Sequence, residues 1–151
     1  MSFNKNDIIE AIQNSPNPKV KVAITDIDGI LRGKYLHKDK KRPFFHEREI
    51  WFCHLGTNIG FEQDGQNDQF LRPVIILRKF NNEICLVVPL TRTLKEGIHY
   101  FIFAFKDQKS SAILSQIRLV DSKRLKYKSG DINQADYKQL KQKLKQLLEL
   151  E

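Results

Sequence analysis

The chain has 151 residues, of which 40% are hydrophobic and 29% charged, as is typical of one soluble globular domain with a modest extension. Its formal net charge of +8 suggests an anionic partner. Because residues 1–42 and residues 43–151 both carry an excess of Lys and Arg over Asp and Glu, that charge does not reside in a basic tail. We find no signal peptide and no apolar run of membrane-spanning length, so we expect a cytoplasmic protein without a membrane partner.

The N-terminal part predicts a short helix and a hairpin. Residues 4–14 carry isoleucines at helical spacing, and Pro16 ends the pattern. Residues 19–36 read as two strands around Asp28-Gly29, a pair that favours a tight hairpin turn. A charged stretch, residues 37–42, ends at Pro43 and predicts a linker. We therefore expect an extension over residues 1–42 and a separate domain over residues 43–151.

From Arg48 onward the sequence predicts short strands joined by turns. Apolar runs that are β-branched or aromatic occupy residues 48–55, 72–80, 83–90, 99–105 and 111–120. Asn81-Asn82 and residues 106–110 mark two hairpin turns, and a long polar loop follows the first run. This spacing favours a small barrel or a sandwich. Cys53 and Cys85 lie inside apolar runs without metal-site spacing, so we expect buried thiols in a reducing compartment.

The C-terminal residues predict an amphipathic helix with Asn133 as its N-cap and Asp136 near its positive end. Its apolar face is formed by Tyr137, Leu140, Leu144, Leu147 and Leu148. We expect this face to cover the barrel, with binding of a partner as the alternative.

Four motifs occur in order after Arg48, and together they resemble the MazF/PemK family of type II toxins. They are a Gly-x-x-x-Gly-x-Glu-Gln-x-Gly loop at Gly56–Gly65, the Arg72-Pro73 strand start, a strand that ends in Thr91, and the Gln116-Ile117-Arg118 strand with its Asp121–Leu125 turn. The resemblance implies a mainly β fold, an SH3-like small barrel with a C-terminal helix, here preceded by a short helix and a β-hairpin extension. It also implies a homodimer that cuts single-stranded RNA without metal or cofactor and is neutralised by a cognate antitoxin.

The chain departs from this pattern between Asp64 and Arg72, where it inserts GQNDQFL. The loop over the expected active site is therefore longer than in the shorter members. We expect this length to change base preference, so the family's cleavage sequences do not transfer.

The resemblance assigns catalytic positions to Arg72 and Thr91, with Glu62 as a weaker candidate. A guanidinium can bind two phosphate oxygens in parallel and stays charged, as stabilisation of the transition state requires. A threonine hydroxyl can donate to phosphate or orient the 2′-OH, although at a strand end it often only satisfies a backbone group. Glu62 is either the base or a loop carboxylate that balances Arg72.

RNA-binding candidates are Gln63, Gln116, Trp51 and Phe61. Gln116 either reads a base edge or pairs with loop backbone, and the aromatic rings either stack on bases or fill the core. A histidine acid–base pair, as in other metal-free ribonucleases, does not fit, because His54 and His99 lie outside the motifs. The competing function is a catalytically impaired barrel that only binds nucleic acid or protein.

Residues 19–40 resemble the N-terminal start of glutamine synthetase. Their sequence is KVKVAITDIDGILRGKYLHKDK. The metal and nucleotide sites of that enzyme belong to a much longer domain, so its activity is excluded by length. Asp26 and Asp28 imitate an Asp-x-Asp phosphatase motif, but the sheet that such an enzyme needs does not fit here. Either the extension is an evolutionary remnant, or its hairpin adds strands to the barrel or to a synthetase subunit.

Overall fold

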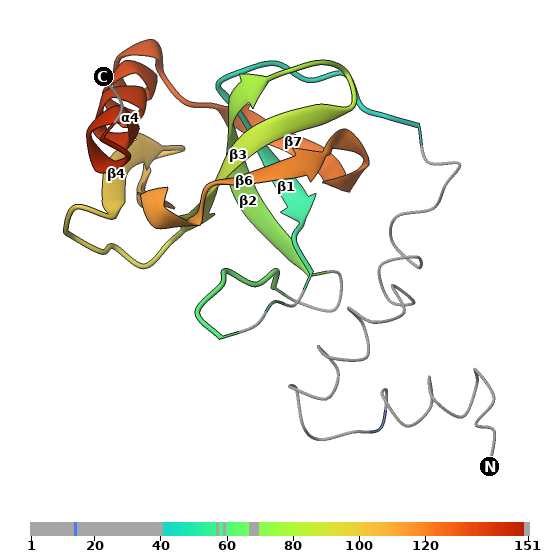
Figure 1. Ribbon diagram of the computed structural model, residues 1–151, viewed down its shortest axis with the longest axis horizontal. Coiled ribbons are helices and arrows are strands. Elements are labelled where there is room, and N and C mark those ends of the chain that lie inside the picture. The colour runs from blue at the N-terminus through green and yellow to red at the C-terminus, as the bar shows by residue number, and fades with distance from the viewer. Residues whose placement is uncertain (1–13, 15–40, 57, 59, 67–69, 150–151) are drawn as a thin grey trace.

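The computed structural model describes residues 14, 41–56, 58, 60–66 and 70–149, and these form a β-rich unit with one C-terminal helix (Figure 1). All strand pairs are antiparallel. The elements are β1 (Glu49–His54), β2 (Leu71–Lys79), β3 (Ile84–Thr91), β4 (Tyr100–Phe105), β5 (Gln108–Ile113), η1 (Leu114–Gln116), β6 (Arg118–Asp121), η2 (Ser122–Arg124), β7 (Leu125–Asp131) and α4 (Gln134–Leu147).

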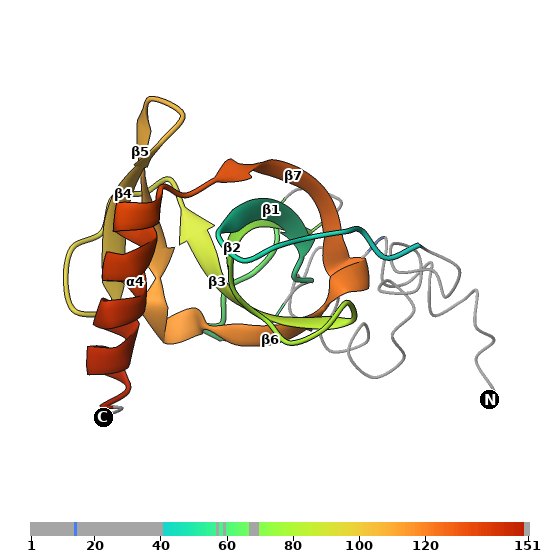
Figure 2. The same ribbon diagram turned by 90° about the horizontal axis from the view of Figure 1, so that it is seen from above.

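The strands run in the order β4-β5-β3-β2-β1-β7, and β6 pairs with β3 as well. Seen from above, β1, β2, β3, β6 and β7 curve around a common interior, with α4 beside β4 outside it (Figure 2). Because successive strand residues point to opposite faces, β2 supplies both cores. Val74 and Ile76 lie in one buried cluster, called the inner cluster, together with Phe45, Trp51 and Cys53. Ile75 and Leu77 lie in a second buried cluster, which includes Tyr137 and Leu140 of α4 and is called the cluster under α4.

This architecture confirms the expected mainly β fold with a C-terminal helix. Asn133 caps α4, its side chain accepting a hydrogen bond from the Asp136 backbone N–H at 2.8 Å. Tyr137 and Leu140 are buried in the cluster under the helix, and the Tyr137 hydroxyl donates to the Leu77 carbonyl at 2.7 Å. Leu148 was expected on the same face but lies just after the helix end and is exposed.

The expectation of one strand over residues 111–120 is wrong. η1 divides this stretch, because its two halves pair with different parts of β3: Ala112 lies opposite Leu90, whereas Arg118 lies opposite Val87. β7 was not expected at all. Its sequence, LKYKSGD, buries only Leu125 fully, so it lacks the apolar alternation by which strands are recognised.

Residues 41–45, which begin with the described end of the expected linker over 37–42, pack against the barrel. The Arg42 guanidinium donates to both carboxylate oxygens of Asp121, at 2.6 and 3.1 Å. The Phe45 side chain is completely buried in the inner cluster, and Lys79 donates to the Phe45 carbonyl at 3.1 Å. The packed unit therefore includes Arg42.

The expected helix over 4–14, apart from Asn14, and the hairpin over 19–36 lie outside the described residues, as does the stretch 19–40. Among the residues that the structure describes, none forms a helix long and apolar enough to cross a membrane. Cys53 and Cys85 are both buried, as expected, and burial raises the pKa of the Cys85 thiol to about 11.

Candidate functional site

Arg72 lies near the start of β2, opposite Cys53 of β1, and its side chain is buried, with 6% exposed. Its guanidinium donates through Nε to the Asp64 carbonyl and through Nη1 to the Leu90 carbonyl at 3.2 Å. Burial lowers the pKa of Arg72 from its usual value, and the nearby Asp64 carboxylate opposes that change. The cation is thus held by backbone dipoles in a largely water-free position, where fixed charge acts most strongly.

Thr91 ends β3 close to the start of β2, because the Arg72 guanidinium donates to the carbonyl of the preceding residue, Leu90, at 3.2 Å. The recorded pairs of the two strands at this end stop at Val74 with Pro89, and the same register continued by two residues would bring Thr91 opposite Arg72. Facing residues of antiparallel strands project to the same side of the sheet. The Thr91 hydroxyl accepts a hydrogen bond from the Thr93 backbone N–H at 3.2 Å. This is the ordinary strand-end role, and it leaves the hydroxyl proton able to donate.

A loop, described at residues 56, 58 and 60–66, lies at this end of the barrel and below β1 and β2 in Figure 1. The Asp64 carboxylate accepts the Asn58 backbone N–H at 2.6 Å, and the Gly65 N–H donates to the Gly56 carbonyl at 2.8 Å. A Cβ added at Gly65 would lie 1.8 Å from the Phe70 carbonyl oxygen, so only glycine fits there. This packing fixes the Asp64 carbonyl that caps Arg72.

Gln116 ties the loop to the rest of the site. Its side-chain oxygen accepts the Gln63 N–H, and its side-chain nitrogen donates to the Phe61 carbonyl, both at 3.2 Å. The amide therefore pairs with loop backbone, the second of its two expected roles, and its base-reading atoms are occupied. Gln63 takes part through its backbone, and its side chain is half-buried.

The remaining residues predicted for the site differ in exposure: Phe61 is exposed, whereas Trp51 is buried. Phe61 is fully exposed on the loop and presents its ring to solvent. The Glu62 carboxylate lies 4.0 Å from Arg118, so the cation it approaches is Arg118, not Arg72 as expected. Trp51 is buried in the inner cluster, and its indole donates to the buried Glu49 carboxylate at 2.8 Å. That position does not fit the expected contact of Trp51 with RNA.

Sequence reasoning missed two residues of this end. Asp64 was not identified, because it accepts the Arg72 hydrogen bond through its backbone carbonyl, and a pattern of side chains does not predict such a contact. Arg118 follows Gln116 by two residues within a recognised motif, and that spacing was a usable signal for a second cation beside the loop. The described residues include no group of three or more His, Cys, Asp and Glu side chains placed to hold a metal ion.

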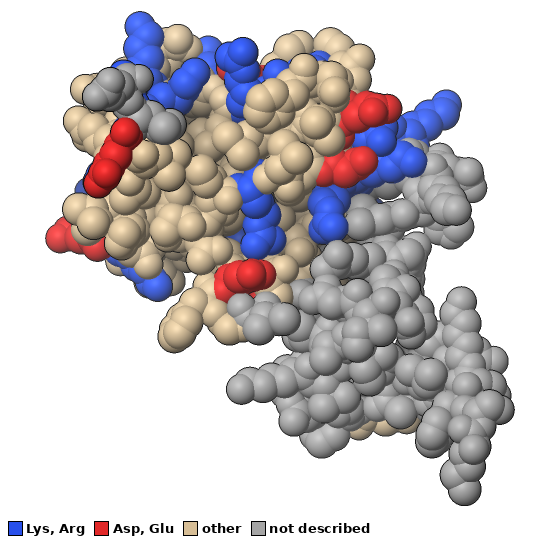
Figure 3. Space-filling view, viewed as in Figure 1, with Lys and Arg blue, Asp and Glu red and all other residues tan. Residues whose placement is uncertain are grey.

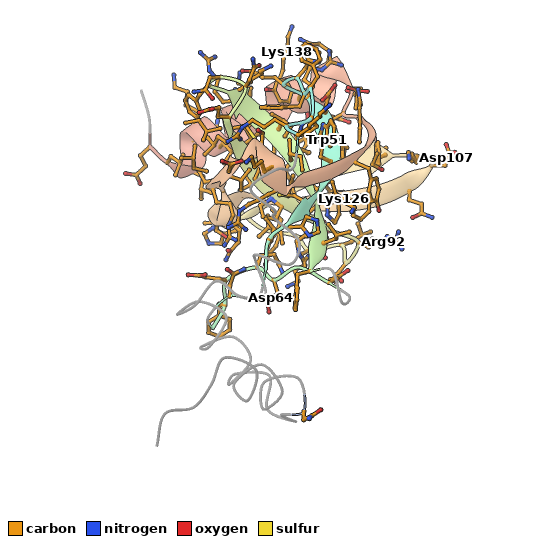
Figure 4. The ribbon with its side chains drawn as sticks, turned by 90° about the vertical axis from the view of Figure 1, so that its right-hand side faces the viewer. Trp51, Asp64, Arg92, Asp107, Lys126 and Lys138 are labelled. Atoms are coloured by element: carbon orange, nitrogen blue, oxygen red, sulfur yellow. The ribbon has the colours of Figure 1, made fainter. Side chains whose placement is uncertain are left out.

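Charge around the site is mixed. On the face shown in Figure 3, basic and acidic side chains are interspersed with wide uncharged areas. In Figure 4, Asp64 marks the loop end, and Trp51 lies within the body of the barrel. Arg92 follows Thr91 in sequence and lies on the side from which the hairpin carrying Asp107 projects. The position of an individual Lys or Arg therefore says more about where an anionic ligand would bind than the net charge of the chain does.

Several solved structures share this fold. MazF from Deinococcus radiodurans is similar with a TM-score of 0.61 and 16% identity, covering 73% of this chain and 99% of that one. The Mycobacterium tuberculosis toxin MazF-mt6 is similar with a TM-score of 0.54 and 16% identity, and the match covers 69% of this chain and 99% of that one. An endoribonuclease from Mycobacterial species, solved in complex with its cognate antitoxin, has a TM-score of 0.57 and 15% identity. The match covers 72% of this chain and 98% of that one. At these identities the likeness shows the fold. No curated protein matches the chain.

A family model described as PemK-like, MazF-like toxin of type II toxin-antitoxin system matches residues 46–148. It begins well after residue 40, so it gives no support to the resemblance of residues 19–40 to glutamine synthetase. It contains Arg72, Thr91 and the loop that covers them, and it spans more than half of the chain. The chain therefore belongs to the PemK-like, MazF-like toxins of type II toxin–antitoxin systems.

Proposed function

We propose that this toxin is an endoribonuclease that cuts single-stranded RNA without a metal ion. The 2′-oxygen attacks the adjacent phosphorus in line, and the bond from phosphorus to the 5′-oxygen breaks. The 2′-OH loses its proton to a base, for which Glu62 is the candidate, and the departing 5′-oxygen takes up a proton. The products are a 2′,3′-cyclic phosphate and a 5′-hydroxyl end.

Arg72 and Thr91 are proposed to act on the phosphate oxygens. The observation that supports this proposal is that the start of β2, with Arg72, and the end of β3, with Thr91, lie together, as the hydrogen bond from Arg72 to the Leu90 carbonyl shows, in a chain of a toxin family. The guanidinium supplies fixed charge for the pentavalent transition state, and the threonine hydroxyl donates a hydrogen bond to it. Such positioning and charge account for much of the rate in phosphoryl chemistry of this kind.

The buried state of Arg72 adds a step to this mechanism. Its Nε and Nη1 groups are bonded to the carbonyls of Asp64 and Leu90, so a phosphate competes with backbone for the guanidinium. Displacing the Asp64 carbonyl requires the loop over residues 56–66 to shift. RNA binding is therefore proposed to move the loop away from Arg72. A negatively charged phosphate then takes the place of the Asp64 carbonyl beside the guanidinium.

The test is to express the chain in cells and map RNA ends. We expect growth arrest and new 5′-hydroxyl ends with the wild-type chain, and neither with Arg72→Ala. Arg72→Lys keeps the charge but loses the planar pair of donors, so its activity should fall between these two. Arg78→Ala is the matched control, because Arg78 is an exposed arginine on the same strand. Wild-type expression without arrest and without new ends would refute the ribonuclease.

A second function, a barrel that binds RNA or protein without cutting, is favoured by the burial of Arg72 under the loop. Purified wild-type chain and Arg72→Ala distinguish the two functions when RNA binding and RNA cleavage are measured on the same samples. Equal binding by both chains, with no cleavage by either over hours, would indicate the binding module.

An antitoxin partner and a homodimer are also proposed. The antitoxin follows from family membership and from the mycobacterial endoribonuclease, which was solved with its cognate antitoxin. Co-expression with the product of the adjacent reading frame should restore growth. Light scattering on the purified chain measures whether two copies associate. Pull-down of glutamine synthetase by the full chain tests the remaining partner, for which we expect no capture.

A further inference from the structure

A pocket of about 290 Å³ opens beside Thr91, and its described lining includes no residue of the loop that caps Arg72. One wall comes from the β4–β5 hairpin and the other from β1 and β7, with the ends of β2 and β3 between them. Its lining includes Thr91, Arg92, Phe52, Phe105, Lys106 and Ser129. None of the motifs recognised in the sequence accounts for the hairpin wall.

The register of β5 explains why the pocket exists. β5 pairs with β3 only at Ala112 and Ser111, whereas β4 and β5 stay paired out to Phe105 and Gln108. The outer half of the hairpin therefore projects past β3 and leaves a gap toward β1 and β7. Figure 4 shows Asp107, at the hairpin tip, standing out from the body of the molecule.

Contacts with β7 hold the hairpin in place. The Lys106 ammonium donates to the Ser129 hydroxyl at 3.3 Å. The Phe105 ring packs so closely on Gly130 that a Cβ there would lie 2.8 Å from a ring carbon. A residue other than glycine would require the ring to move, so this contact helps to hold Phe105 against β7.

The chemistry of the lining is that of a nucleotide site. The Phe52 and Phe105 side chains supply aromatic surface, and the Phe52 ring is stacked on Tyr127 at 4.7 Å between centroids. Exposed cations, Arg92 and Lys106, lie at the pocket, and no acidic residue is among the lining residues that the structure describes. Aromatic rings that stack bases, with cations that hold phosphates, are how proteins bind single-stranded nucleic acid.

We propose that this pocket binds the base of the nucleotide next to the scissile phosphate, with Arg92 and Lys106 on the flanking phosphate. The inference rests on the proposed ribonuclease function, because it assumes that RNA reaches Thr91. Thr91 lines the pocket, so RNA that reaches the Thr91 hydroxyl also meets the aromatic and cationic lining. The occupant is single-stranded RNA, and not a second copy of the chain, because the cations at the pocket complement a polyanion.

The test uses the full chain and a short single-stranded RNA with methylated 2′-oxygens, which it cannot cut. A 2-aminopurine base in this RNA reports stacking by fluorescence quenching. Arg92→Ala with Lys106→Ala should weaken binding roughly 10- to 100-fold and reduce the slope of log K against log salt by about 0.7, since one phosphate contact is lost. Phe105→Leu should weaken binding roughly 5- to 20-fold and abolish most of the quenching.

Matched controls separate a pocket effect from loss of charge or of an aromatic ring. Lys109→Ala with Lys126→Ala removes the same charge from β5 and β7 at exposed positions outside the pocket lining. Phe80→Leu makes the same change at an exposed phenylalanine in the β2–β3 turn. Both controls should bind as the wild-type chain does.

Cleavage of unmodified RNA, measured in parallel, keeps the two proposals apart. If the wild-type chain cuts RNA and the pocket variants bind like their controls, the subsite is refuted while the ribonuclease stands. If the methylated RNA binds through the pocket but unmodified RNA is never cut, the subsite stands and the ribonuclease fails. If light scattering shows that the pocket variants split a dimer without altering RNA binding, the face is an interface between copies and the subsite is overturned.

Discussion

The loop-covered end of the barrel and the pocket beside the β4–β5 hairpin both contain an arginine, but in opposite physical states. Arg72 is buried and bonded to two backbone carbonyls, whereas Arg92 is exposed at the mouth of the pocket. A buried cation is already oriented and acts strongly on nearby charge, but it is costly to remove or to reach. An exposed cation is screened by water and salt, so it attracts a polyanion without contributing much to the fold.

The largest effect that would test this comparison is that of Arg72→Ala on cleavage. We expect the rate to fall roughly 10²- to 10³-fold or more, because a preorganised donor to the transition state is lost. The free energy of unfolding should also fall, by about 1–3 kcal/mol, since the Asp64 and Leu90 carbonyls lose a partner. Single-turnover cleavage and urea unfolding measure the two quantities. Unchanged unfolding would mean that Arg72 is not held as described.

Gly65→Ala follows in overall size, and its effect is on stability, with an expected loss of about 2–4 kcal/mol, the largest stability loss among these variants. The clash is with the Phe70 backbone carbonyl, which cannot move like the end of a flexible side chain. Gly97→Ala is a useful comparison, because an added Cβ there meets no atom within 4 Å although the backbone has positive φ. Urea unfolding of both variants should rank Gly65→Ala as the more damaging. Equal losses would show that backbone strain, and not the contact with Phe70, dominates.

Gln116→Ala should lower the free energy of unfolding by about 1 kcal/mol, because two hydrogen bonds to loop backbone are lost. The more specific readout is hydrogen exchange of the Gln63 amide, which should become faster while the amides of β2 and β3 keep their protection. Gln146→Ala, on α4, provides the control. Uniform acceleration across the barrel would contradict a local role in holding the loop.

The smallest effect is expected at the pocket. Arg92→Ala should change the free energy of unfolding by less than about 0.5 kcal/mol, in contrast with Arg72→Ala, because the side chain is exposed. Thermal unfolding of the two variants side by side measures the contrast directly. A large loss for Arg92→Ala would mean that this cation is part of the fold and would erase the distinction between the two regions.

The parts of the fold that the sequence predicted are those determined by local patterns. Short apolar runs rich in β-branched residues predicted the strands around Val74 and Val88, and Asn133 with Asp136 marked the start of α4. Residues 111–120 were misread because their continuous apolar character conceals a change of partner along β3. β7 was missed because a strand with mostly exposed side chains is held by backbone pairing, which leaves little trace in composition.

The sequence by itself determined the family. It also predicted catalytic positions at Arg72 and Thr91 and a loop before Arg72 that is longer than in the shorter members, and both stay predictions. Only the tertiary structure decided that Trp51 is a core residue bonded to Glu49, that Gln116 holds the loop, and that the Asp64 carbonyl caps Arg72. It also produced the pocket between the hairpin and β7. The physical reason is that these features depend on register and on contacts between residues far apart in the chain, which a local pattern does not encode.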